Sequence, residues 1–334
     1  MEPIAFYTWQ ALTLAVQQDR PQMAAELGPL LHDLSWVRTE AGTHAPSLCL
    51  TVRQDDHQCR VPPTAREVFR AGGVRGLECG DDYYLTIEAS LLHLKMQQGR
   101  GEAWLAPTFA AMPISLRRTF WAFGLLKLLR PLGFFSVHAA GVVSGHGDGL
   151  LIIGRSGSGK STLALGLLRQ GWGVLSDDAV LLRRQPDGVA ALACRKHLFV
   201  HAEAATRYAD LPLGEEVPDG AGGWKRCIDI ETAFPEQQVA GCRPRVLLFS
   251  HIVPQPQSAL RPMDGPTALR QLLTHSGPQL FDRRTMRPHL EVLQGLVRQT
   301  TTYELRAGRD LYEEPCTLMR LLHETEGATQ WPDW

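Results

Sequence analysis

Short apolar runs separated by turn-forming residues dominate the first third of the chain. Residues 48–52, 83–87 and 103–106 are rich in β-branched, aromatic and leucine side chains, which predicts strands. From residue 115 to residue 130 the apolar positions fall mostly at helical spacing, and Pro131 and Gly133 then interrupt the pattern. We therefore expect a mixed α+β N-terminal domain over residues 1–115 and a helix that leads into a second domain, residues 116–334.

The second domain opens with a pattern of strand, tight loop and helix. Residues 134–143 and 150–153 predict two strands joined by a turn, as in a β-hairpin. Residues 161–170 have a helical apolar pattern, and Gly171 is a suitable C-terminal cap. The next strand, residues 172–175, leads to Asp177 and Asp178. This alternation predicts an α/β fold.

The remainder of the chain continues the same mixture. Residues 205–224 are rich in Gly, Pro and acidic residues and are predicted to form a loop. Residues 246–249 predict a further strand, and helices are expected near residues 267–274, 288–298 and 314–324.

Composition and charge narrow the classes of function. The chain has 334 residues, 44% hydrophobic and 21% charged, with a formal net charge of −1, so no global field favours nucleic acid or an anionic membrane as partner. Its first ten residues lack a signal-peptide pattern, and the longest apolar runs are too short for a membrane span. Seven cysteines without a Cys-x-x-Cys pair favour reduced thiols and a cytoplasmic protein.

Residues 154–161 read Gly-Arg-Ser-Gly-Ser-Gly-Lys-Ser and match the Walker A pattern, between a predicted strand and a predicted helix. Glycines let the backbone amides face a phosphate, and the helix N-terminus adds partial positive charge. Lys160 is expected to pair with the β and γ phosphates, and the Ser161 hydroxyl to coordinate Mg²⁺. The residues predicted to bind ATP are Gly154, Ser156, Gly157, Ser158, Gly159, Lys160, Ser161 and Thr162.

Asp177 and Asp178 follow the strand after the loop helix, where side chains face the crevice at the carboxyl edge of a parallel sheet. One carboxylate can hold Mg²⁺ and the other can accept the proton of an attacking hydroxyl. The alternative is a solvated turn, but the spacing from Lys160 favours a functional pair. His138, taken alone on an apolar strand, is more often a structural residue.

His138, the phosphate loop and the Ser-Asp-Asp run at residues 176–178 occur in an order and spacing that resemble the HPr serine kinase/phosphorylase family. The resemblance covers roughly residues 130–185. It implies a phosphate-loop kinase core related in fold to phosphoenolpyruvate carboxykinase, with ATP and Mg²⁺ as cofactors. It matches His138 to the family's active-site histidine, Asp177 to its catalytic acid/base and Asp178 to the neighbouring acidic residue, which we expect to bind the metal.

The chain departs from the family after the aspartate pair. The glutamate-arginine-glycine signature has no counterpart, and the usual N-terminal half has no match. A second metal ligand, the reverse phosphorylase reaction and HPr as the acceptor are therefore not implied. The chain is more similar to divergent HPr-kinase-like kinases that accompany modified-peptide pathways such as those of lasso peptides.

Phosphoryl transfer also needs a cation beside the transferred group, and Lys225 and Arg226 are the candidates. The sequence thus predicts an ATP-dependent kinase of a serine or other hydroxyl on a protein or peptide, with no nucleic-acid or membrane partner and with homo-oligomers possible. Three alternatives stay open: a kinase of a small-molecule hydroxyl, an ATP-binding switch without transfer, and a simple ATPase. The absence of Asn-Lys-x-Asp and Leu-Ser-Gly-Gly-Gln segments argues against GTPases and transporter ATPases.

Overall fold

The computed structural model describes residues 4–19, 21–40, 45–54, 61–201, 205–218, 223–277, 283–314 and 316–326. The chain divides into two compact units, Met1–Phe134 and Phe135–Trp334. This division falls later than the predicted boundary at residue 115, because the predicted helix, α2 (Ile114–Leu129), packs against the strands of the first unit. Within the described residues, no helix is both long and apolar enough to span a bilayer.

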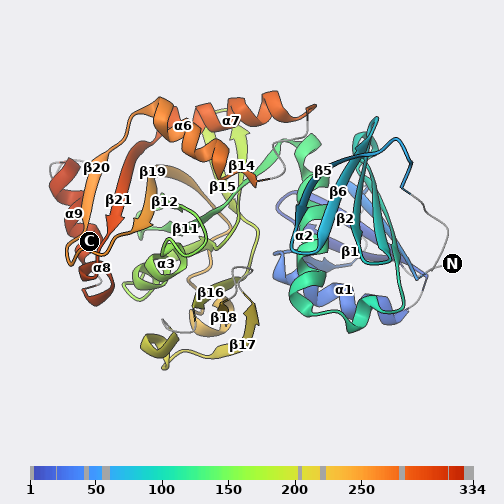
Figure 1. Ribbon diagram of the computed structural model, residues 1–334, viewed down its shortest axis with the longest axis horizontal. Helices are drawn as coiled ribbons and strands as arrows, with labels where there is room; N and C mark the ends of the chain where they lie inside the picture. The colour runs from blue at the N-terminus through green and yellow to red at the C-terminus, as the bar shows by residue number, and fades with distance from the viewer. Residues whose placement is uncertain are drawn as a thin grey trace. The chain divides into compact units, whose positions relative to one another are not determined.

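The first unit is a nine-stranded sheet in the order β3-β1-β2-β4-β9-β8-β7-β6-β5, accompanied by helices α1 and α2 (Figure 1). The predicted strands at residues 48–52 and 83–87 lie within β4 and β7, and the one at residues 103–106 overlaps the end of β9, so the α+β prediction for this unit is confirmed. Its elements are β1 (Ile4–Trp9), β2 (Leu12–Gln18), α1 (Pro21–Asp33), β3 (Val37–Thr39), β4 (Leu48–Gln54), β5 (Arg66–Ala71), β6 (Val74–Cys79), β7 (Asp82–Ile87), β8 (Ser90–Lys95) and β9 (Arg100–Leu105).

The second unit is built on a mixed sheet in the order β10-β14-β15-β19-β12-β11-β13, with β21 and β20 added beside β19. Its central strands are β10 (Phe134–Val137), β11 (Ala139–Val143), β12 (Asp148–Ile153), β13 (Gly173–Ser176), β14 (Val180–Gln185), β15 (Gly188–Ala193), β19 (Gly241–Ile252), β20 (Ala259–Pro262) and β21 (Thr301–Ala307). Strands β12, β19 and β21 run parallel, and β11 forms the expected antiparallel hairpin with β12. The α/β class is therefore confirmed.

Helices cover both faces of this sheet, as Figure 1 shows for α3 on one side and α6 with α7 on the other. Alternate residues of β12 divide between two cores: Leu150 and Ile152 pack with α3, whereas Leu151 and Ile153 pack with α6 and α7. Burial on both faces explains why this strand is apolar throughout. The helices are α3 (Lys160–Leu168), α5 (Ile230–Ala233), α6 (Gly265–Thr274), α7 (Met286–Gln299), α8 (Asp310–Glu313) and α9 (Thr317–Glu326).

Two predictions for this unit need correction. The run at residues 134–143 is two strands, because the His138 amide leaves the sheet and donates to the His275 carbonyl at 2.8 Å. The segment predicted as a loop over residues 205–224 contains β17 (Leu213–Pro218), which forms a three-stranded sheet with β16 (His197–His201) and β18 (Trp224–Asp229). Leu213 packs against the core and outweighs the turn-forming composition around it, and residues 219–222 of this prediction lie outside the described residues.

Candidate active site

Four chain segments meet at the same edge of the second unit's sheet. Strands β12 and β13 both pair antiparallel with β11, which lies between them, so both end at one edge, where β11 begins. Strand β15 ends there too, because Ala193 pairs with Val180 at the start of β14. This topology brings together the phosphate loop, the aspartate pair, His138 and the residues after β15. The strands before the loop and before the aspartates, β12 and β13, are not neighbours in a parallel sheet, because the antiparallel strand β11 lies between them.

The phosphate loop turns tightly between β12 and α3. A Cβ on Gly154 would lie 2.3 Å from Ser158 Oγ and 2.6 Å from the Ser250 carbonyl oxygen, so only glycine fits there. Gly159 has φ of 86° and caps the N-terminus of α3, whose first amides have no partner within the helix. Unpaired amides at a helix N-terminus favour an anion.

Lys160 lies inside the loop. Its Nζ donates to the carbonyl oxygens of Gly154 at 2.9 Å and Arg155 at 3.0 Å. Burial lowers the pKa of this ammonium, and the carboxylates of Asp177 and Asp178 oppose that shift. The amino group is therefore held where an incoming phosphate would meet it.

Asp177 is turned inward and bonded to the loop helix. Its Oδ2 accepts hydrogen bonds from Ser161 Oγ at 2.8 Å and from the Phe199 amide at 3.1 Å, and the residue is 1% exposed. Its Oδ1 is buried without a hydrogen-bond partner among the described residues. Burial raises the pKa of this carboxyl, with a further rise from the charge of Asp178.

Asp178 faces outward in a backbone conformation that few residues other than glycine adopt, with φ of 66°. Its side chain is 43% exposed. His138 Nδ1 donates to the Asp178 carbonyl oxygen at 2.7 Å and lies 3.2 Å from Oδ1, while Arg195 Nη1 lies 3.7 Å from Oδ2. Partial burial would raise the pKa of Asp178, but the His138 hydrogen bond and the charges of Arg195, His138 and Lys225 outweigh it and lower the pKa.

Lys225 and Arg226 point in different directions, as successive residues of a strand do. Lys225 Nζ lies 3.4 Å from Ser156 Oγ in the phosphate loop. Arg226 instead forms two hydrogen bonds with Glu216 on β17, at 2.8 and 3.1 Å. The structure therefore places Lys225 at the loop and Arg226 away from it.

The remaining predicted nucleotide-binding residues are all in the loop or the first turn of α3. Ser158 is buried, its backbone carbonyl accepts from Ser250 Oγ at 3.0 Å, and Thr162 is partly buried beside Ser161. Gly157 has φ of 79°, which suits glycine.

Three residues at this edge were missed by the sequence analysis. His275 lies close enough to His138, Lys160 and Arg155 for their charges to act on it, and burial lowers its pKa to about 4. The Tyr312 hydroxyl is buried next to Gly159, where an added Cβ would lie 2.3 Å from it. Arg195 contacts Asp178. None of the three belongs to a recognisable motif, and each lies in or directly after an element that the sequence does not place beside the loop.

The donors at this edge fit a magnesium ion. Mg²⁺ prefers a few hydroxyl and carboxylate oxygens together with substrate phosphates and water. Ser161 Oγ and the Asp177 carboxylate are in contact, and the unpartnered Asp177 Oδ1 provides a free acceptor beside them. Among the described residues no cluster of three His, Cys, Asp or Glu side chains offers an all-protein site.

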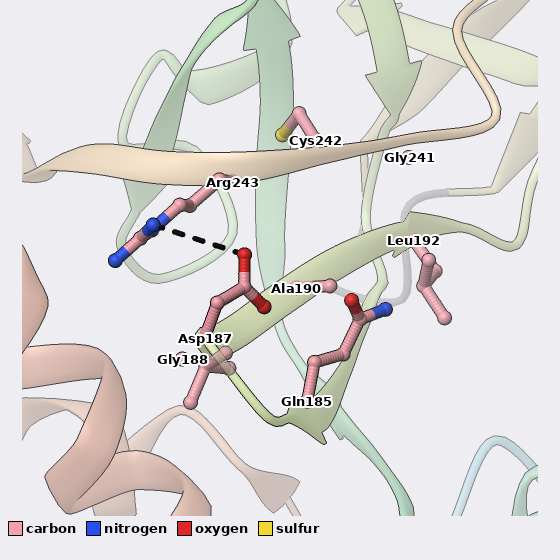
Figure 2. A pocket seen from close by; sticks show the side chains of 9 residues that line it. Gln185, Asp187, Gly188, Ala190, Leu192, Gly241, Cys242 and Arg243 are labelled. Carbon is pink, nitrogen blue, oxygen red and sulfur yellow. Dashed lines mark ion pairs between the residues drawn. The ribbon is translucent and has the colours of Figure 1, made fainter.

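A separate hollow of about 250 Å³ lies at the opposite edge of the sheet, around the β14–β15 turn (Figure 2). Figure 2 shows Asp187 and Arg243 facing each other. Arg243 Nη1 lies 3.8 Å from Asp187 Oδ2. In the parallel pairing of β19 with β12, Arg243 lies opposite Asp148 at the start of β12, whereas the phosphate loop follows the other end of that strand. This hollow is therefore not part of the candidate active site.

No family model matches the chain. The chain is 40% identical over 60 residues to the HPr kinase/phosphorylase of Chlorobium chlorochromatii, which covers 18% of each protein. It is 28% identical over 115 residues to that of Chlorobium phaeovibrioides, covering 34% of this chain and 32% of the relative. The HPr(Ser) kinase/phosphatase of Coxiella burnetii superposes with a TM-score of 0.33 and 15% identity, over 57% of this chain and 90% of that one.

The matched segments thus span less than a third of the length of these curated relatives. Both curated relatives carry the name HPr kinase/phosphorylase. They confirm, at modest identity, that the chain is similar to the HPr kinase/phosphorylase family.

Proposed function

We propose that this chain is an ATP-dependent kinase that transfers a γ-phosphoryl group to a hydroxyl group of a protein or peptide. The observation that carries the proposal is the division of the aspartate pair. Asp177 is bonded to Ser161 in the phosphate loop helix, whereas Asp178 is exposed at the mouth of the same site beside His138. A nucleotide-binding loop next to an accessible carboxylate is the arrangement that phosphoryl transfer to a hydroxyl requires.

The loop supplies the nucleotide site. The amides at the start of α3 and the ammonium of Lys160 are placed to bind the β and γ phosphates of ATP. Lys225 adds a second positive charge at Ser156. This concentration of positive charge supports a polyanionic ligand in a chain whose net charge is only −1.

Ser161 and Asp177 are the residues that would hold Mg²⁺. Bound there, the ion would neutralise phosphate charge as the transfer proceeds. The contribution of the chain is to hold the partly buried Ser161 hydroxyl against the buried Asp177 carboxylate.

Asp178 is the proposed proton acceptor. From the sequence we expected this role for Asp177 and metal binding for Asp178. The exposure of the two side chains favours the reverse, because geometry is the first requirement of a general base. The acceptor oxygen forms a bond to the γ-phosphorus, its proton passes to Asp178, and the bond from phosphorus to the β,γ-bridging oxygen breaks to release ADP. The lowered pKa makes Asp178 a weaker base than a free aspartate, so this assignment rests on its exposure beside His138.

The acceptor is proposed to be a serine hydroxyl. HPr is named in the relatives, and a biosynthetic precursor peptide is the acceptor that we favour for this divergent chain.

The test is incubation of the purified chain with Mg²⁺ and γ-labelled ATP, in the presence of HPr and of short peptides encoded beside its gene. The proposal predicts label covalently attached to a serine by the wild-type chain and none by Lys160→Ala. Release of labelled inorganic phosphate alone would make the chain an ATPase. ATP-dependent association with a peptide, without attached label, would make it a nucleotide-dependent switch.

A further inference from the structure

Arg195 is held at the catalytic edge by its backbone. Its amide donates to Ser176 Oγ at 3.1 Å, and the neighbouring Cys194 Sγ donates to the Ala179 carbonyl at 3.0 Å. Both partners flank the aspartate pair. The segment after β15 is therefore fixed to the end of β13, and the backbone of Arg195 is held beside the aspartate pair.

The guanidinium of Arg195 has little to bind within the protein. Its Nη1 lies 3.7 Å from Asp178 Oδ2, which is longer than a hydrogen bond, and within the described part of the chain it has no other side-chain partner. The Arg195 side chain is 25% exposed. A guanidinium carries five N–H donors, so most of them remain free for a ligand.

Two other cations of the site, Lys160 and Lys225, already contact the phosphate loop. Lys160 donates to the carbonyls of Gly154 and Arg155, and Lys225 lies against Ser156. Arg195 is instead beside Asp178, where the acceptor hydroxyl would meet the γ-phosphate. The forked donors of arginine suit two oxygens of one phosphoryl group better than a lysine ammonium does.

We infer that Arg195 is a further catalytic residue, which binds the phosphoryl group in flight between ATP and the acceptor. This inference rests on the proposed function. As the bond between the γ-phosphorus and the bridging oxygen breaks and the bond to the acceptor oxygen forms, the negative charge of the transferred group is spread over its three equatorial oxygens. Arg195 donates hydrogen bonds to these oxygens and forms no covalent bond.

A complex with a transition-state analogue tests this without an identified acceptor. ADP, Mg²⁺ and aluminium fluoride together imitate a phosphoryl group in flight, whereas ADP alone imitates only the nucleotide. Binding of both would be measured by calorimetry for the wild-type chain, Arg195→Gln and Arg195→Lys. We expect Arg195→Gln to bind ADP as the wild type does and the aluminium fluoride complex about 100-fold more weakly. Arg195→Lys should recover part of the loss.

Arg243→Gln is the matched control, because Arg243 also has a loose carboxylate partner, Asp187 at 3.8 Å, but at the opposite edge of the sheet (Figure 2). It should bind both ligands as the wild type does. An aluminium fluoride complex of unchanged affinity in Arg195→Gln would overturn the inference and leave the proposed function standing. Equal losses for ADP and for the complex would also overturn it, since they indicate a role in folding or nucleotide binding. Failure of the wild type to form the complex would overturn the proposed function itself.

Discussion

Ser161 Oγ donates a hydrogen bond to Asp177 Oδ2 at 2.8 Å, which joins the phosphate loop helix to the aspartate pair. The buried carboxylate of Asp177 accepts this bond, whereas the neighbouring carboxylate of Asp178 contacts His138 and is partly exposed to solvent. The two residues are adjacent in sequence but occupy different environments. Their different pKa directions, raised for Asp177 and lowered for Asp178, follow from this difference.

Replacement of the two aspartates should therefore have different effects. Asp178→Asn removes the proton acceptor, and we expect phosphoryl transfer to fall by about 10²-fold or more while ATP affinity is retained. Asp177→Asn should raise the Mg²⁺ concentration needed for half-maximal transfer. Initial rates over a magnesium titration measure both effects. If Asp177→Asn abolishes transfer at saturating Mg²⁺ while Asp178→Asn preserves it, the proton acceptor is Asp177 instead.

Lys225 and Arg226 provide a second comparison. Lys225→Ala removes the charge beside Ser156, so we expect a higher KM for ATP. Arg226→Ala breaks only an exposed pair with Glu216, which contributes about 1 kcal/mol or less to stability, and should leave the KM near that of the wild type. Steady-state kinetics with ATP as the varied substrate distinguishes the two. A larger change in Arg226→Ala would contradict the placement of these side chains.

Because Gly159 lies against Tyr312, substitutions at these two positions should have coupled effects on stability. A Cβ at Gly159 would lie 2.3 Å from Tyr312 Oη, and the residue would also have to adopt φ of 86°. We expect Gly159→Ala to lower the melting temperature and to weaken ATP binding, at a backbone cost of about 1 kcal/mol or more.

Adding Tyr312→Phe to Gly159→Ala should restore part of the stability, because it removes the clashing oxygen, which has no hydrogen-bond partner among the described residues. Thermal melts of the four proteins in this cycle give the coupling. Strictly additive effects would show that the two residues are not in contact.

His275 should make stability depend on pH. Burial and the positive charges of His138, Lys160 and Arg155 lower its pKa to about 4, whereas a histidine in an unfolded chain titrates near about 6.5. Between these values the unfolded chain binds more protons than the folded one, so His275 costs stability increasingly as the pH falls through this range.

His275→Gln removes this titration. When the pH is lowered from about 7 to about 5, the melting temperature of the variant should fall less than that of the wild type. His251→Gln, at a half-exposed histidine, is the control and should follow the wild type. An identical acid-induced loss in His275→Gln and the wild type would be inconsistent with the surroundings described for His275.

The fold of the second unit was predictable where a local pattern determines it. The glycine spacing over residues 154–161, the apolar strand before it and the helix after it are confirmed by β12 and α3. Strands β14 and β15 were not predicted, although they form a hairpin beside the aspartate pair. Their arginine-rich and alanine-rich sequences lack the periodicity that marks a strand, and burial against α7 stabilises them instead.

The sequence predicted the motif residues of the candidate site, together with His138 and Lys225, which lie beside them. The sequence selected Lys160, Ser161 and the aspartate pair, but it did not indicate which carboxylate points inward. That difference depends on the Phe199 amide, which comes from a strand 22 residues away from Asp177. The positions of Arg195 and His275 likewise depend on strand pairing and helix packing, which no local pattern records.

The most direct test of this account is a crystal structure of the chain with a non-hydrolysable ATP analogue and Mg²⁺. The account predicts the triphosphate in the loop of residues 154–161, with the ion at Ser161 and Asp177 and with Asp178 facing the terminal phosphorus. An empty loop, or an Asp178 carboxylate turned away from a bound γ-phosphate, would contradict it.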